Sequence, residues 1–213
     1  MFQAIFVEPL TNILRFLNLY FNDLGLAIIV FSIFLKILIS PLSFLQFKEE
    51  LKLKKINEKI NKLAKKEKDI LKKAEIISKI YEEEKFNPIY NMLVQFSTLP
   101  FYLATIFVIQ NSLKTTMTPF FLNLIDLTKP SAILSFIVII FQIFFVFTQP
   151  KESRKILLFI SGILAVIIFF FSSAFLLYFL VIIVLNLLER KLFNLYHIKF
   201  GIVSIEEDNS YRS

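Results

Sequence analysis

The stretch LGLAIIVFSIFLKILISPL, residues 24–42, is apolar along almost its whole length and contains a single lysine, Lys36. A helix crosses the hydrocarbon core of a bilayer with about 20 consecutive apolar residues, so the stretch predicts a transmembrane span that ends at Pro41. An ammonium group in such a span costs about 2.5–3.5 kcal/mol on insertion scales. The surroundings of Lys36 must therefore offset that cost or use it.

The whole chain is unusually apolar: 56% of its 213 residues are hydrophobic, with 27 Phe and only 3 Gly. Several further stretches approach or exceed the length of a transmembrane helix. The alternating segments of about ten residues that mark a transmembrane barrel are absent from the sequence. The predicted class is an all-α polytopic membrane protein.

The hydrophobic stretches divide into five predicted transmembrane helices, at residues 23–46, 87–111, 131–149, 155–172 and 174–193. The last two come from one apolar stretch that is too long for a single span, and we divide it near Ser172 and Ser173. Residues 1–22 are amphipathic and predict an interfacial helix along the membrane surface, with a poor first span as the alternative. We expect an extracytoplasmic loop at 112–130 and a cytoplasmic tail at 194–213 with a disordered polar end.

Residues 47–86 are rich in lysine, contain no Gly or Pro, and still carry periodic apolar residues. The apolar positions form two sets: Leu53, Ile56, Ile60 and Leu63, then Ile70, Leu71, Ala74, Ile77 and Tyr81. Two amphipathic helices joined by a turn near 66–69 explain this pattern, and one long charged helix is the alternative. We interpret the segment as a cytoplasmic helical hairpin.

Lysine and arginine are concentrated in the 47–86 segment, in the short loop at 150–155, and at Arg190 and Lys191. Basic segments stay on the cytoplasmic side of a membrane. Five spans place all three segments on one side, with the N-terminus outside and the C-terminus in the cytoplasm. The expected location is therefore the plasma membrane.

The sequence offers little for catalysis. It has no cysteine, one histidine, and neither a carboxylate dyad nor a glycine-rich phosphate loop. We therefore expect no enzyme activity, no cofactor and no metal site. An intramembrane peptidase that uses a serine and Lys36 is the remaining catalytic alternative, but nothing in the sequence places a serine against this lysine.

Polar residues recur at helical spacing in the predicted spans. They are Ser32, Lys36, Ser40 and Ser43 in the first, Asn91, Gln95, Thr98, Tyr102 and Thr105 in the second, Ser135, Gln142 and Gln149 in the third, and Ser161, Ser172, Tyr178 and Asn186 in the last pair. Such groups usually face a bundle interior or a water-filled cavity. We predict a polar groove lined by Lys36, Ser32, Ser40, Gln95, Thr98, Tyr102, Gln142, Tyr178 and Asn186.

Two simpler interpretations remain open. The polar groups could be interhelical hydrogen-bond partners, and Lys36 could snorkel toward the cytoplasmic surface. No acidic residue lies in the core of any predicted span, and Glu189, at a helix end, is the nearest by depth. Lys36 is therefore expected to be an unpaired cation that attracts anionic groups.

Several motifs, in order along the chain, resemble the YidC/Oxa/Alb family of membrane protein insertases. They are EPLTNILRFL from Glu8, GLAIIVFSIFLKILISPL at 25–42, IYEEEKFNPI at 80–89, TLPFYLA around Pro100 and SSAFLLYFL at 172–180. Pro41, Asn87, Pro88 and Pro100 carry the structural motifs. The chain departs from the family where Lys36 replaces the usual arginine, Thr98 a glutamine, and Ile182 and Ile183 a polar pair.

The resemblance implies an insertase and chaperone that receives nascent membrane proteins in a hydrophilic groove, which is open to the cytoplasm and to lipid and closed outside. It implies that the basic hairpin touches anionic lipids, it leaves the ribosome and the Sec translocon open as partners, and it implies no role for DNA. The alternative functions are a small-solute or anion channel or transporter, and a membrane scaffold that inserts nothing.

Overall fold

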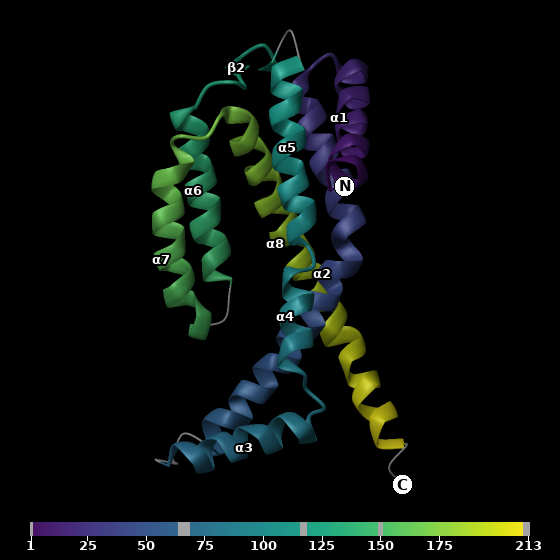
Figure 1. Cartoon of the computed structure of the whole chain (residues 1–213), viewed down its shortest axis with the longest axis vertical. Helices are drawn as coiled ribbons and strands as arrows, with labels where there is room; N and C mark the ends of the chain where they lie inside the picture. Colours follow the sequence, from purple (N-terminus) through teal and green to yellow (C-terminus); the bar gives the residue numbers. More distant parts are fainter. Residues whose placement is uncertain (1, 64–68, 116–118, 149–150, 211–213) are drawn as a thin grey trace. The chain divides into compact units, whose positions relative to one another are not determined.

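The computed structural model describes residues 2–63, 69–115, 119–148 and 151–210 (Figure 1). The chain forms two compact units, one of Met1–Leu38 with Phe101–Ser213 and one of Ile39–Pro100. The described elements, in chain order, are the π-helical turn η1 (Gln3–Val7), α1 (Glu8–Phe21), α2 (Leu24–Leu63), α3 (Ile70–Glu83), α4 (Pro88–Phe96), α5 (Leu99–Thr115), β1 (Phe120–Phe121), β2 (Ile125–Asp126), α6 (Ala132–Phe147), α7 (Lys151–Ile168) and α8 (Ser173–Ser210).

Apolar helices make up most of the described chain. Three segments are long and apolar enough to cross a membrane: Leu24–Leu63, Pro88–Thr115 and Ser173–Leu195. Two shorter apolar helices are Ala132–Phe147 and Leu157–Ile168. The prediction of an all-α polytopic membrane protein is confirmed.

Pro41 does not end the first helix, as the sequence suggested. It lies inside α2, which continues to Leu63. Proline removes one backbone donor from the helix ladder, but membrane helices tolerate it where neighbouring groups satisfy the freed carbonyl. The boundary between the two units falls just before this proline, at Leu38 and Ile39.

The second predicted span is broken into α4 and α5 at Ser97 and Thr98. Pro100 has no N–H to continue the ladder and disfavours helical geometry in the residue before it. The Ser97 hydroxyl donates a hydrogen bond of 2.7 Å to the Val94 carbonyl, which helps to close the last turn of α4.

In the second unit, the end of α2 and α3 share a small apolar core. Ile56, Ile80 and Phe86 are buried in it, with Leu53, Ile60, Ile76 and Tyr81 packed around them. Leu63, Ile70 and Leu71 from the predicted apolar sets are largely exposed instead. The predicted turn at 66–69 lies outside the described residues except for Asp69, which caps α3 by accepting a hydrogen bond of 3.0 Å from the Leu71 N–H.

The loop predicted at 112–130 contains a β-hairpin that the sequence pattern did not show. Phe120 pairs with Asp126 and Phe121 with Ile125, and Leu122 and Asn123 form the turn with positive φ values of 51° and 56°. The Leu122 N–H donates to an Asp23 carboxylate oxygen at 2.6 Å. A Cβ on Gly25 would lie 2.3 Å from the Phe121 ring, so the hairpin seats closely on the start of α2.

In the first unit, α6 packs against both α7 and α8 (Figure 1). Helix α7 begins at Lys151, within the predicted basic loop, so residues 151–155 are helical. Gln149, from the predicted polar set, lies outside the described residues. Helix α8 starts at Ser173, as the division of the last apolar stretch indicated, and continues to Ser210 through most of the predicted disordered tail.

Candidate functional site

Lys36 has a carboxylate partner, so the prediction of an unpaired cation is wrong. Its Nζ lies 2.5 Å from Oε2 of Glu189, and the two side chains are 8% and 15% exposed. Both residues belong to the first unit, Lys36 on α2 and Glu189 on α8. The sequence pattern placed Glu189 at a helix end, whereas α8 carries it within the apolar segment Ser173–Leu195.

The ion pair accounts for the lysine in an apolar span. Removing an ammonium and a carboxylate from water is costly, and their mutual attraction offsets that cost where the geometry is close. Removing one partner of such a pair leaves a buried charge without compensation. Lys36 and Glu189 therefore depend on each other energetically.

Two tyrosines extend the polar cluster. Tyr102 on α5 is partly buried and interacts electrostatically with Glu189. Tyr178 on α8 is only 2% exposed, its hydroxyl lies beside that of Thr105, and it also interacts with Tyr102. Three helices, α2, α5 and α8, thus contribute polar groups to one buried cluster, which we call the Lys36–Glu189 cluster: Lys36, Glu189, Tyr102, Tyr178 and Thr105.

Ser32 and Asn186 flank this cluster on the same two helices as the ion pair. Ser32 is buried one turn before Lys36, and its hydroxyl donates to the Ile28 carbonyl at 2.6 Å. Its acceptor lone pairs remain available while its proton is used within the helix. Asn186 lies about one turn before Glu189 on α8, so the two residues share a helix face.

Gln142 has an interhelical role in the described structure. Its amide donates a hydrogen bond of 3.3 Å to the Ser161 hydroxyl, which joins α6 to α7. This contact is the polar glue that is common between membrane helices. The observed contact of Gln142 is therefore the interhelical hydrogen bond that the simpler interpretation of the polar residues describes.

Ser40, Gln95 and Thr98 belong to the second unit. The Gln95 side chain is exposed, whereas Thr98 is buried. Both are organised by Gln46, whose amide donates to the carbonyls of Val94 and Gln95 at 3.0 and 3.1 Å and to the Thr98 hydroxyl at 3.2 Å. Sequence reasoning missed Gln46, although it continues the stripe three residues after Ser43.

The Asn-Pro motif serves as a helix start. Oδ1 of Asn87 accepts hydrogen bonds from the N–H groups of Ile89 at 2.9 Å and Tyr90 at 3.1 Å, and Pro88 occupies the first position of α4. Asparagine is a preferred N-cap, and proline is tolerated at the first helical position because its missing N–H would be unpaired there. These two residues therefore shape α4.

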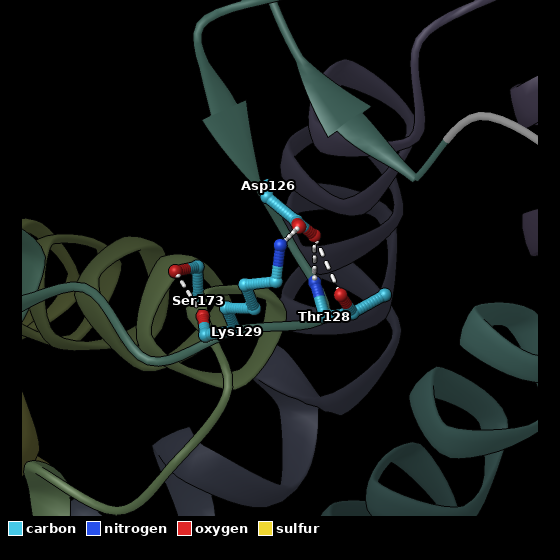
Figure 2. A network of polar contacts seen from close by, with 4 residues as sticks. All are labelled: Asp126, Thr128, Lys129 and Ser173. Carbon is cyan, nitrogen blue, oxygen red and sulfur yellow. Dashed lines mark hydrogen bonds and ion pairs between the residues drawn. The ribbon is translucent and has the colours of Figure 1, made fainter.

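A second polar network lies at the start of α8 (Figure 2). The Asp126 carboxylate pairs with the Lys129 ammonium at 2.8 Å and accepts hydrogen bonds from the Thr128 N–H at 3.0 Å and hydroxyl at 2.6 Å. The Lys129 carbonyl accepts from the Ser173 N–H at 2.8 Å and hydroxyl at 2.6 Å. This loop network fastens the loop to the first residue of α8.

The same contacts shift ionisation in the loop network. The hydrogen bond from Lys129, with those from Thr128, lowers the pKa of Asp126 to about 2, and the Asp126 carboxylate raises the pKa of Lys129. Lys129 is exposed and Asp126 only partly buried, so these shifts report local contacts rather than a buried charge.

A pocket of about 420 Å³ lies between α6 and α8, close to Glu189 along the chain. Its lining combines apolar and basic side chains, including Phe144, Leu187, Leu188, Arg190 and Lys191. The basic residues of this pocket, Arg190 and Lys191, directly follow Glu189, the partner of Lys36, in the sequence.

Comparison with known proteins identifies the family. The family model of the 60Kd inner membrane protein matches residues 16–199. The chain is 34% identical over 122 residues to the membrane protein insertase YidC of Buchnera aphidicola subsp. Baizongia pistaciae, covering 57% of this chain and 23% of that relative. It is 29% identical over 126 residues to YidC of Caulobacter vibrioides, covering 59% of this chain and 20% of that relative.

A third relative, YidC of Magnetococcus marinus, is 31% identical over 122 residues. The matched region spans about a fifth of the length of these relatives, as the 20–23% coverage shows. The family match and the motifs around Lys36, Asn87 and Pro100 agree along most of the chain. This chain belongs to the 60Kd inner membrane protein family, which is the YidC/Oxa/Alb family that its motifs resemble.

Proposed function

We propose that this chain is a membrane protein insertase, which moves short polar tails across the bilayer and apolar segments into it. The observation that carries the proposal is the Lys36–Glu189 cluster, buried among apolar helices of a chain that belongs to an insertase family. Polar groups in such helices are costly, and they usually mark a substrate path or a hydrated interior.

In this proposal the cluster is part of a hydrophilic groove that admits the polar tail of a nascent protein. Lys36, Tyr102, Tyr178, Ser32 and Asn186 supply charged and hydrogen-bonding groups from α2, α5 and α8. A tail that enters the groove keeps polar partners while it crosses part of the membrane. The hydrophobic distance that it must cross is thereby shortened.

The energy comes from the substrate itself. Transfer of its apolar segment from water to lipid is favourable in proportion to the apolar area that leaves water. A membrane potential adds about 2.3 kcal/mol per elementary charge per 100 mV for a tail of the right sign. The proposed reaction therefore requires no nucleotide.

The loop network supports closure of the groove on the outside. The Ser173 hydroxyl donates a hydrogen bond to the Lys129 carbonyl, and Phe121 of the β-hairpin packs against Gly25 at the start of α2. Both contacts lie at the starts of α2 and α8, before Lys36 and Glu189 in the two helices. A polar tail would accordingly enter from the other end, which the proposed topology places in the cytoplasm, with the N-terminus outside.

The helical hairpin of the second unit is proposed to contact anionic lipid headgroups. Its lysines Lys54, Lys55, Lys72 and Lys73 are exposed, while its apolar core turns inward. Clustered lysines near a membrane surface are attracted to anionic lipids by about 1 kcal/mol each. Nascent membrane proteins and these lipids are the proposed partners, and a ribosome or Sec translocon would be an additional one.

Rescue of cells depleted of their own insertase tests the proposal, with translocation of a substrate tail scored by protease protection. The chain should restore growth and protect the tail. Lys36→Ala should translocate acidic tails less well than the wild type does, because it leaves Glu189 as an uncompensated negative charge, and Lys36→Arg should match the wild type. Lys114→Ala, at an exposed lysine near the end of α5, is the matched control. Solute flux from liposomes without any insertion would instead favour a channel.

A further inference from the structure

The cation of the proposed groove is already neutralised by a residue of the same chain. Lys36 and Glu189 approach to 2.5 Å and are nearly buried, and they come from helices far apart in the sequence. When the carboxylate of a substrate tail reaches Lys36, the lysine ammonium is therefore already paired with Glu189.

Glu189 also lies within electrostatic range of Tyr102 on a third helix, α5. Its side chain is only 15% exposed and contacts Lys36, so the carboxylate belongs to the cluster rather than to the outer surface of α8. A second carboxylate brought to the same lysine would lie close to that of Glu189. Like charges at such a distance repel, and the low exposure of the site weakens screening by water and salt.

We infer that Glu189 is a specificity-determining residue, an internal counterion that disfavours acidic tails and leaves the groove selective for uncharged polar tails. An acidic tail must displace Glu189 from Lys36 before it can use the cation. An uncharged tail of serine, threonine or asparagine can hydrogen-bond within the cluster while the ion pair stays closed. This inference rests on the proposed insertase function.

A purely structural role for the pair makes a different prediction. If Glu189 only holds α8 to α2, its loss should weaken insertion of every substrate to the same degree. A counterion that competes with the substrate changes the ratio between substrates that differ only in tail charge. The ratio is therefore the informative measurement.

The experiment uses the purified full chain in proteoliposomes without a membrane potential, so that the tail charge is not driven by the field. Two substrates share one apolar segment and carry short tails with either two aspartates or two asparagines. The wild type should translocate the aspartate tail no better than the asparagine tail. Glu189→Gln should raise the ratio of aspartate to asparagine translocation by about fivefold or more, the lower end of typical coupling between sites.

Glu8→Gln, at an exposed carboxylate on α1, is the matched control and should leave the ratio unchanged. An unchanged ratio in Glu189→Gln, or an equal loss for both tails, would overturn the inference. The wild-type ratio is a second test that does not depend on folding of the variant, since a clear wild-type preference for the aspartate tail would also overturn it. If the wild type inserts neither substrate, the proposed function itself fails and this inference fails with it.

Discussion

Two lysine–carboxylate pairs lie along α8, one at Glu189 near its middle and one beside Ser173 at its start, in different surroundings. At Glu189 the pair with Lys36 is 15% and 8% exposed and joins two distant helices. At Ser173 the loop network contains a pair between Asp126 and Lys129, which are neighbours in sequence and 26% and 77% exposed. The same two chemical groups therefore serve different purposes: the Asp126–Lys129 pair shapes a loop, whereas the Lys36–Glu189 pair places two nearly buried charges between apolar helices.

The largest effect is expected from breaking the buried pair. Lys36→Ala should lower the free energy of unfolding by about 3–5 kcal/mol, because Glu189 is left buried without a counterion. Chemical denaturation in detergent measures this loss. Lys129→Ala is the matched change at the exposed pair and should alter stability little. Equal losses for the two variants would contradict the contrast between the two pairs.

The fit of the β-hairpin at the loop end gives the next largest effect. A Cβ at Gly25 would lie 2.3 to 2.6 Å from the Phe121 side chain, including its Cβ, so Gly25→Ala should displace the hairpin at a cost of about 1–3 kcal/mol. To measure this, a cysteine is introduced at the buried position Val108, and thermal unfolding is followed with a thiol-reactive dye. Gly162→Ala is the control, since no atom lies within 4 Å of its added Cβ, and it should be neutral or stabilising.

Two neighbouring serines at the start of α8 allow a hydrogen-bonded hydroxyl to be compared with one that has no partner among the described residues. Ser173→Ala removes a hydrogen bond of 2.6 Å to the Lys129 carbonyl and should cost about 0.5–1.5 kcal/mol. The buried Ser172 hydroxyl has no hydrogen-bond partner among the described residues, so Ser172→Ala should cost nothing or stabilise. Denaturation midpoints of the two variants check the difference. A larger loss for Ser172→Ala would show that the loop network is assigned to the wrong serine.

The smallest expected effect is the loss of loop stability at low pH, when Asp126 becomes protonated. The pKa of Asp126 is depressed to about 2 from 3.8, so its contribution to loop stability is complete above about pH 4 and is lost as the pH falls toward 2. Proteolysis of the loop should therefore quicken over this range in the wild type. In Asp126→Asn it should be fast already at neutral pH and change little with acid. Parallel pH profiles for the two proteins would count against the network.

The sequence was more informative about where the apolar helices lie than about which of their polar side chains contact each other. Apolar length located the span around Lys36 and the start of α8 at Ser173, because both follow from composition along one helix. The partner of Lys36 was missed because pairing with Glu189 depends on how α2 and α8 are rotated about their axes. Helical spacing shows which residues share one face of a helix, but not which residue of another helix that face meets.

Two other features escaped prediction for local reasons. The β-hairpin turns at Leu122 and Asn123, and leucine is an uncommon residue at positive φ. Gln46 donates to the Val94 and Gln95 carbonyls just before the break in the second span, and the sequence pattern did not predict that break. The hairpin turn contains no Gly or Pro to signal it, whereas the spacing of Gln46 after Ser43 could have indicated that residue.

Contact between a substrate tail and the Lys36–Glu189 cluster tests the central claim most directly. A photoreactive phenylalanine analogue can replace Tyr102, in the cluster, or Leu103, the next residue on α5, which is 51% exposed. With a nascent chain arrested during insertion, the polar tail should cross-link to position 102 and not to position 103. Equal cross-linking at the two positions, or cross-linking at 103 alone, would contradict a polar groove at this cluster.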